Sequence, residues 1–133
     1  MAKNSILVVE DEESLLKLQS ILFTTKGYAV TGVGDGDQAL VAIARHPPDL
    51  VVLDVMIPGP DGFQVCRAIK DDLQTRCIPV VILTGRKSSL DLERGRLAGA
   101  DAYLTKPFKS VKLLEVVAEL LAARQDGRGA NSP

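Results

Sequence analysis

The sequence has little of what secreted, metal-stabilised or membrane proteins need. Its two cysteines, Cys66 and Cys77, stand in no CxxC or Cys/His spacing, which argues against a disulfide framework or a structural zinc site. No apolar stretch approaches the ~20 residues of a membrane helix. Residues 1–5 lead directly into an apolar segment without the charged leader of a signal peptide. We therefore expect a soluble, cytoplasmic protein without membrane contact.

A surplus of charge of one sign is also missing. The 16 lysines and arginines nearly balance the 17 aspartates and glutamates, and no window is strongly basic. Proteins that bind DNA or RNA directly usually carry a basic stripe or patch. The charge distribution thus argues against direct nucleic-acid binding.

What the sequence does contain is short apolar runs that alternate with longer amphipathic segments. Three of the runs are almost continuous Val, Ile and Leu, which is typical of strands covered on both faces by helices. The order of strand and helix, repeated five times, predicts the α/β class. We expect a single doubly wound sheet of five parallel strands with five helices, in the flavodoxin-like arrangement. The five runs are residues 6–9, 28–33, 50–53, 80–83 and 100–104.

Helical spacing marks the segments between the runs. Leucines at 15, 18 and 22 form one stripe of the first helix, which Gly27 ends. The remaining helices are expected over residues 37–45, from Phe63 onward, over 89–97 and around the leucine stripe at 113–121.

A chain of 133 residues fits one domain with a real core. We place that domain at residues 4–123. Residues 124–133 are polar, with two glycines and a proline, and are expected to form a disordered tail or the start of a linker.

Polar side chains gather where four of the predicted strands end. Glu10 and Asp11 follow the first strand, Asp54 follows the third, Thr84 the fourth and Lys106 the fifth. Ligands of open α/β sheets bind beyond these carboxyl ends. The carboxylates repel one another unless a divalent cation such as Mg²⁺, which prefers oxygen ligands, relieves the repulsion. With a lysine charge and a threonine hydroxyl added, the set predicts a phosphoryl-transfer site in which a carboxylate attacks phosphorus.

Each of these residues has an ordinary explanation when taken singly. Asp11 could cap a helix, and Asp54 or Thr84 could simply occupy a turn. Only their combination at four strand ends favours a site.

These segments resemble the response-regulator receiver domain of two-component signal transduction. The matching pieces read ILVVEDE at 6–12, DLVVLDVMIPG at 49–59 with Asp61-Gly62 after it, VILTG at 81–85 and GADAYLTKPF at 99–108. Order and spacing both fit, and the resemblance covers residues 4–123.

The resemblance implies how the acidic residues would act. Asp54 would accept the phosphoryl group. Asp11 and Asp54 would bind Mg²⁺ directly together with the backbone carbonyl of Met56, and Glu10 would hold the ion through water.

It also implies a switch. Thr84 and Lys106 would bind the phosphoryl group, and Tyr103 would be the switch aromatic that turns inward as Thr84 moves. The bond between Lys106 and Pro107 would be a cis peptide.

By the same resemblance, the phosphoryl group would come from a phosphohistidine on a sensor histidine kinase or a phosphotransfer protein. The chain would then act as a phosphorylation-dependent switch rather than an enzyme for external substrates, and would hydrolyse its own phosphoryl group slowly. Its output would pass to an unknown downstream protein or effector domain, from a monomer or a weak phosphorylation-dependent dimer. Ala102 and Val116 stand where the DNA-binding, winged-helix subfamily usually carries an Asp and an Arg that pair across a dimer, which argues against that interface and that subfamily.

Three alternatives compete with this function. The first is a degenerate receiver that acts by protein contact without phosphorylation. The second, a phosphatase or phosphotransferase, would carry a second Asp two residues after the nucleophile, where this chain has Met56. The third, a flavodoxin-like module for a nucleotide or flavin, would need a glycine-rich loop where this chain has acidic residues 10–12.

Overall fold

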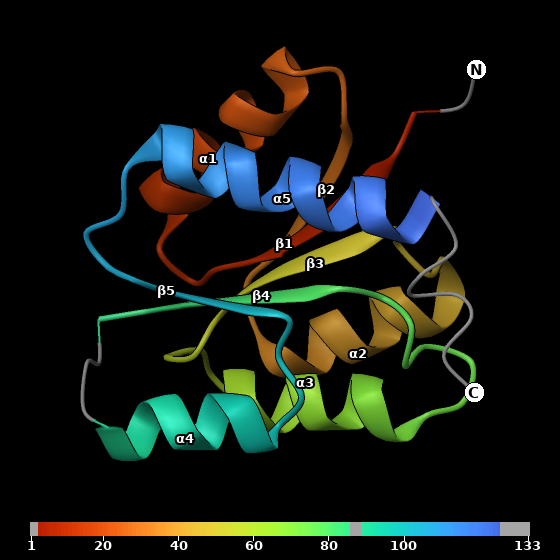
Figure 1. The fold of residues 1–133 in the computed structure, drawn as a ribbon, viewed down its shortest axis with the longest axis vertical. Coiled ribbons are helices and arrows are strands. Elements are labelled where there is room, and N and C mark those ends of the chain that lie inside the picture. The colour runs from red at the N-terminus through yellow and green to blue at the C-terminus, as the bar shows by residue number, and fades with distance from the viewer. Residues whose placement is uncertain (1–2, 86–88, 126–133) are drawn as a thin grey trace.

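The computed structural model describes residues 3–85 and 89–125, which form five β-strands and five α-helices in strict alternation (Figure 1). The strands are β1 (Ser5–Val9), β2 (Ala29–Val33), β3 (Leu50–Asp54), β4 (Val80–Thr84) and β5 (Ala102–Thr105). The helices are α1 (Glu13–Thr25), α2 (Gly36–Arg45), α3 (Gly62–Asp71), α4 (Ser89–Leu97) and α5 (Ser110–Gln125).

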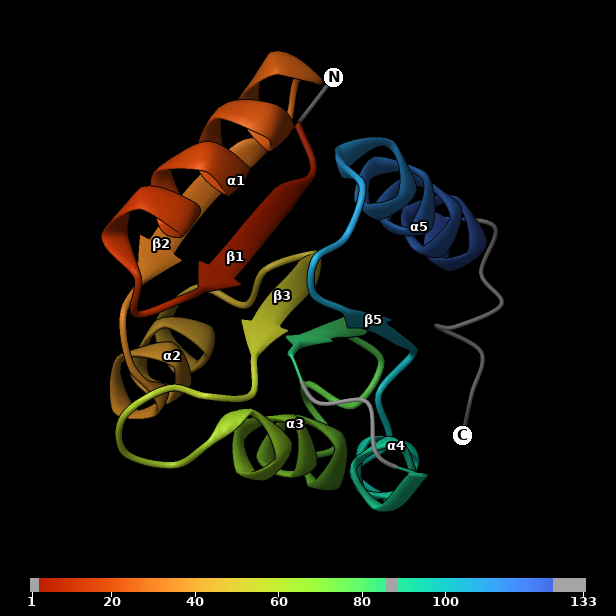
Figure 2. The same cartoon turned by 90° about the vertical axis from the view of Figure 1, so that its left-hand side faces the viewer.

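All strand pairs are parallel, and the order across the sheet is β2-β1-β3-β4-β5. Helices α1 and α5 cover one face, and α2, α3 and α4 cover the other (Figures 1 and 2). This confirms the predicted doubly wound, flavodoxin-like sheet. The order of the strands reverses between β1 and β3, and ligands of such sheets bind beyond the carboxyl ends of the strands at this point.

Burial explains why the strands read as continuous apolar runs. Every residue of β3 and β4 is buried, because helices cover both faces of the central strands. β2 lies at the edge of the sheet, where all five of its residues are exposed or half-buried. Both helical layers therefore pack on one sheet and give the domain two apolar clusters, one on each face.

The stripe predicted for the first helix is wrong at Leu18, which is 48% exposed. The side chains that α1 buries are Gln19 and Phe23. Leu16 packs against the apolar cluster that contains Phe23. Leucines lie on two adjacent stripes of this helix, and only contact with the sheet decides which one faces inward. Within the described residues, the Oε1 atom of Gln19 is buried without a hydrogen-bond partner.

Cys66 behaves as a packing residue. It is fully buried, its thiol donates to the carbonyl oxygen of Ala98 at 3.4 Å, and burial raises the pKa of the Cys66 thiol to about 12. The thiol therefore stays protonated.

The last helix extends further than the sequence indicates. It continues through Arg124 and Gln125, two residues into the predicted tail. Arg124 explains this extension, because its Nη1 donates to the carbonyl oxygen of Asp49 at 2.6 Å and anchors the end of α5 at the start of β3. Residues 126–133 lie outside the described part of the chain. No helix within residues 3–85 and 89–125 is long and apolar enough to cross a membrane.

Candidate phosphoryl and metal site

The carboxyl ends of the central strands carry the predicted polar residues. Glu10 directly follows β1, Asp54 is the last residue of β3, and Thr84 is the last residue of β4. Parallel pairing sets Asp54 beside Leu83, one residue before Thr84, and Thr84 beside Thr105 of β5. The sheet itself therefore brings together residues that lie up to 96 positions apart in the chain.

Lys106 lies between the two buried carboxylates. Its Nζ donates to Asp54 Oδ2 at 2.8 Å and to Glu10 Oε1 at 3.2 Å. The side chains of Glu10 and Asp54 are only 2% and 6% exposed, and that of Lys106 is 24% exposed. The peptide bond that follows this lysine, Lys106–Pro107, is cis, as the resemblance implied. One ammonium group thus compensates two carboxylates at the strand ends.

Burial and neighbouring charges shift the pKa of two members of this cluster, Glu10 and Lys106. Burial is the largest influence on Glu10 and raises the pKa of its carboxyl group above the ordinary value of 4.5, with a further rise from the neighbouring Asp54. Burial also disfavours the charge on Lys106. The hydrogen bond to Asp54 and the attraction of both carboxylates outweigh it, so the pKa of Lys106 is raised. Further positive charge would therefore favour the ionised form of Glu10.

Asp11 completes a group of oxygen ligands suited to a hard cation. One carboxylate oxygen from each of Glu10, Asp11 and Asp54 lies within 4.8 Å of the other two. Asp11 is exposed, which leaves room for the water ligands that Mg²⁺ retains. The N–H group of Met56 donates to Asp54 Oδ1 at 3.1 Å and holds the other oxygen of that carboxylate. All-oxygen donors and the raised pKa of Glu10 fit a bound Mg²⁺ ion.

Tyr103 lies outside the carboxylate cluster. It is half-buried in β5 and packs on the face covered by α2, α3 and α4. A β-carbon added to Gly95 of α4 would lie 2.6 Å from Tyr103 Cδ2, so the ring rests directly on the backbone of that helix. The structure therefore brings together Glu10, Asp11, Asp54, Met56 and Lys106. It places the ring of Tyr103, a residue of β5, against α4.

Gly62 has a part in the site that the sequence does not reveal. A β-carbon there would lie 2.5 Å from the carbonyl oxygen of Asp54 and 2.7 Å from Cα of Val55. Its N–H group also donates to the carbonyl oxygen of Val55 at 3.0 Å. Glycine is thus needed for close approach of the helix to the strand end. The sequence shows this glycine after a turn, but it does not show the contact of the glycine with the backbone of Asp54.

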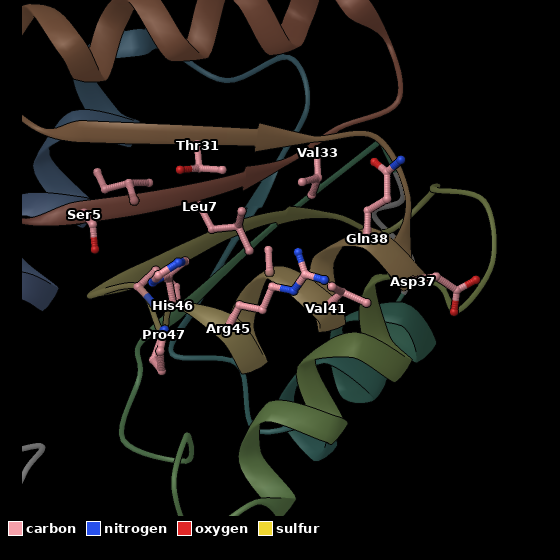
Figure 3. Close-up of a pocket in the computed structure, with 13 residues that line it drawn as sticks. Ser5, Leu7, Thr31, Val33, Asp37, Gln38, Val41, Arg45, His46 and Pro47 are labelled. Carbon is pink, nitrogen blue, oxygen red and sulfur yellow. The ribbon is translucent and has the colours of Figure 1, made fainter.

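A cavity of about 590 Å³ lies elsewhere on the molecule. It opens between the edge of the sheet and α2, where Leu7, Thr31, Val33, Val41 and Arg45 line it (Figure 3). None of the residues of the carboxylate cluster lines this cavity. It therefore belongs to a different part of the surface.

Comparison with known proteins agrees with the fold and with the group of acidic residues. The model of the response regulator receiver domain family matches residues 6–118. The chain is 39% identical over 124 residues to the DNA-binding response regulator MtrA of Mycolicibacterium smegmatis, which covers 93% of this chain and 53% of MtrA. It is 45% identical over 115 residues to the response regulator PleD of Caulobacter vibrioides, which covers 86% of this chain and 25% of PleD.

A solved structure is similar over almost its full length. The receiver domain of sensor histidine kinase PA1611 from Pseudomonas aeruginosa PAO1, with a magnesium ion coordinated in its active-site cleft, has a TM-score of 0.84 and 31% identity, and the match covers 91% of this chain and 99% of that domain. The chain belongs to the response regulator receiver domain family of two-component signalling. It spans about half the length of MtrA and a quarter of PleD.

The raised pKa of Glu10 predicts a pH effect on stability without metal. A carboxyl group whose pKa is higher in the folded state contributes stability below its ordinary pKa of 4.5 and loses it as pH rises through the folded value. In EDTA, the urea midpoint of a Glu10→Gln variant should therefore gain on that of the wild type as pH rises above the ordinary pKa of 4.5. Saturating Mg²⁺ should flatten this difference, and a constant difference in EDTA would contradict the prediction.

Proposed function

We propose that this receiver domain is a phosphorylation-dependent switch that accepts a phosphoryl group on Asp54 from a phosphohistidine. The observation that carries the proposal is the placement of Lys106 Nζ at 2.8 Å from Asp54 Oδ2, beside a group of three carboxylates. A cation against the acceptor can pair with phosphoryl oxygens as readily as with the carboxylate. The second oxygen of Asp54 is held by the N–H group of Met56.

The transfer is a substitution at phosphorus. One carboxylate oxygen of Asp54 forms the new O–P bond while the P–N bond to the histidine ring breaks. The ring nitrogen leaves with the bonding electron pair and takes a proton from solvent. Lys106 and the hydroxyl of Thr84 would bind the oxygens of the transferred group. In the later hydrolysis, water attacks phosphorus and Asp54 leaves as a carboxylate.

Glu10, Asp11 and Asp54, with the Met56 carbonyl, would hold Mg²⁺, which when bound would neutralise charge on the acceptor and on the phosphoryl oxygens. Tyr103 and Thr84 would carry the change to the surface of α4 and β5. The donor would be a sensor histidine kinase or a phosphotransfer protein. The signal would pass to an unidentified downstream protein or to an effector domain. MtrA, by its name, is a DNA-binding response regulator, and a DNA-binding domain is one such effector.

The test is the intact mass of the wild-type chain after incubation with acetyl phosphate, or with phosphoramidate as a P–N donor. We expect one added phosphoryl group in Mg²⁺, none in EDTA, and none in an Asp54→Asn variant in either condition. An Asp71→Asn variant, which changes an exposed aspartate paired with Arg67, should behave like the wild type. Failure of the wild type to gain mass with either donor would favour the degenerate receiver that signals without phosphorylation.

A further inference from the structure

Gly36, the first residue of α2, touches the loop that follows the acceptor strand. It is buried, and its N–H group donates to the carbonyl oxygen of Pro58 at 3.0 Å. A β-carbon on Gly36 would overlap with the carbonyl oxygen of Pro60 and would lie 3.0 Å from the carbonyl carbon of the same residue. Both atoms belong to backbone, so no side-chain rotation relieves the overlap. Gly36 does not have positive φ; it is glycine because the loop occupies the place of a side chain.

The loop that Gly36 touches is held at its other end as well. Asp61 caps α3 through reciprocal hydrogen bonds with Gln64, at 2.9 Å and 2.8 Å. The N–H groups of Ile57 and Gly62 both donate to the carbonyl oxygen of Val55. Residues 55–61 therefore form a short, anchored connection, and Met56, which bonds the Asp54 carboxylate, lies within it.

The chain on the other side of Gly36 also leads to the site. Three residues before it, the carbonyl oxygen of Val33 accepts a hydrogen bond from the N–H group of Glu10 at 3.0 Å. An overlap at Gly36 can be relieved by moving the loop at 58–60 or by moving the connection at 33–36. The first movement displaces Met56 and the second displaces Glu10.

We propose that Gly36 is a positioning residue for the metal and phosphoryl site, which it keeps in register by allowing the β2–α2 connection and the β3–α3 loop to pack backbone against backbone. The inference rests on the proposed function for its phosphorylation readout. Gly36, which lies 18 residues before Asp54, would then set the distance between Glu10 and the segment that contains Met56. A misplacement of about 1 Å can cost ~100-fold in rate. Mutation of a residue that orients metal ligands costs roughly 10–100-fold in metal affinity.

The experiment compares Gly36→Ala with Gly34→Ala. Gly34 lies in the same connection without positive φ, and a β-carbon there would meet nothing within 4 Å. Mg²⁺ affinity is measured by titration calorimetry, and the rate of phosphorylation by intact mass with acetyl phosphate. We expect Gly34→Ala to match the wild type within about twofold, and Gly36→Ala to bind Mg²⁺ about tenfold more weakly and to be phosphorylated at least tenfold more slowly.

Urea unfolding in EDTA separates positioning from stability. A purely structural role would lower the urea midpoint of Gly36→Ala but leave the Mg²⁺ affinity and phosphorylation rate of the folded chain unchanged, and that result overturns the proposal. A second comparison uses Pro60→Gly, alone and together with Gly36→Ala. Glycine at position 60 frees the loop backbone, so that the carbonyl group of this residue can turn away from the side chain at position 36. Added to Gly36→Ala, it should restore part of the Mg²⁺ affinity.

Three further outcomes are decisive. If Gly36→Ala does not fold, the double variant is compared with Pro60→Gly alone, and equal Mg²⁺ affinities overturn the proposal. If the wild type takes up no phosphoryl group, the proposed function fails while the Mg²⁺ affinities still test Gly36. If the wild type is phosphorylated and Gly36→Ala matches it in both measurements, only the assignment of Gly36 fails.

Discussion

Replacing Lys106 with methionine should make the stability of the domain depend strongly on Mg²⁺. In EDTA, we expect the unfolding free energy to fall by about 2 kcal/mol, because the substitution leaves Glu10 and Asp54 buried side by side without a cation. The cost stays below that of breaking a fully buried pair because the lysine side chain is 24% exposed. Mg²⁺ should recover most of the loss, since it supplies the missing positive charge.

Urea unfolding of both chains in EDTA and in saturating Mg²⁺ measures this. The gain in midpoint on adding Mg²⁺ should be larger for Lys106→Met than for the wild type. Lys109→Met is the matched control, because Lys109 is an exposed lysine three residues further on. Equal midpoints of Lys106→Met and the wild type in EDTA would show that Lys106 does not compensate the carboxylates.

The second large effect is expected at Lys70, at the opposite end of the sheet. Its Nζ donates to the carbonyl oxygens of Arg76 at 3.1 Å and Ile78 at 2.7 Å, and to Asp101 Oδ2 at 2.8 Å. The same oxygen of Asp101 accepts from the N–H group of Val80. This one ammonium group therefore ties the end of α3 to the start of β4 and to the turn before β5.

Lys70→Met should cost about 2 kcal/mol and lower the melting temperature by several degrees. Two carbonyl oxygens lose this donor and Asp101 Oδ2 keeps only the N–H group of Val80, around a lysine side chain that is only 16% exposed. Thermal unfolding followed by circular dichroism measures the change. In the control Arg96→Met, the lost partner is Glu93, on the exposed surface of α4, so the melting temperature should stay close to that of the wild type. A Lys70→Met variant as stable as this control would show that the hydrogen bonds of Lys70 do not stabilise the domain.

The sequence was informative about the site because the site lies where strands end. Glu10, Asp54 and Lys106 each follow an apolar run, and parallel strands carry their carboxyl ends to one edge of the sheet. It could not show that one lysine contacts both carboxylates, because that depends on the distance between β1, β3 and the turn after β5. The inward stripe of α1 was misplaced at Leu18 for a related reason, since two leucine stripes fit the helical period equally well.

The role of Gly36 is the clearest case of information absent from the sequence. A glycine with positive φ can be anticipated from a turn, whereas a glycine needed for close packing depends on which backbone approaches it. Arg124 is similar, because its contact with Asp49 joins residues 75 positions apart and extends α5 beyond the expected boundary.

The sequence by itself determined the α/β class, the number and order of the elements and the residue types of the acidic site, because apolar periodicity and strand-end chemistry are local patterns. Tertiary structure decided the rest: which face of α1 is buried, how Lys106 divides its charge between Glu10 and Asp54, and which backbone packs on Gly36. These depend on distances between segments far apart in the chain. Such distances are set by the packing of helices on the twisted sheet, which no local pattern specifies.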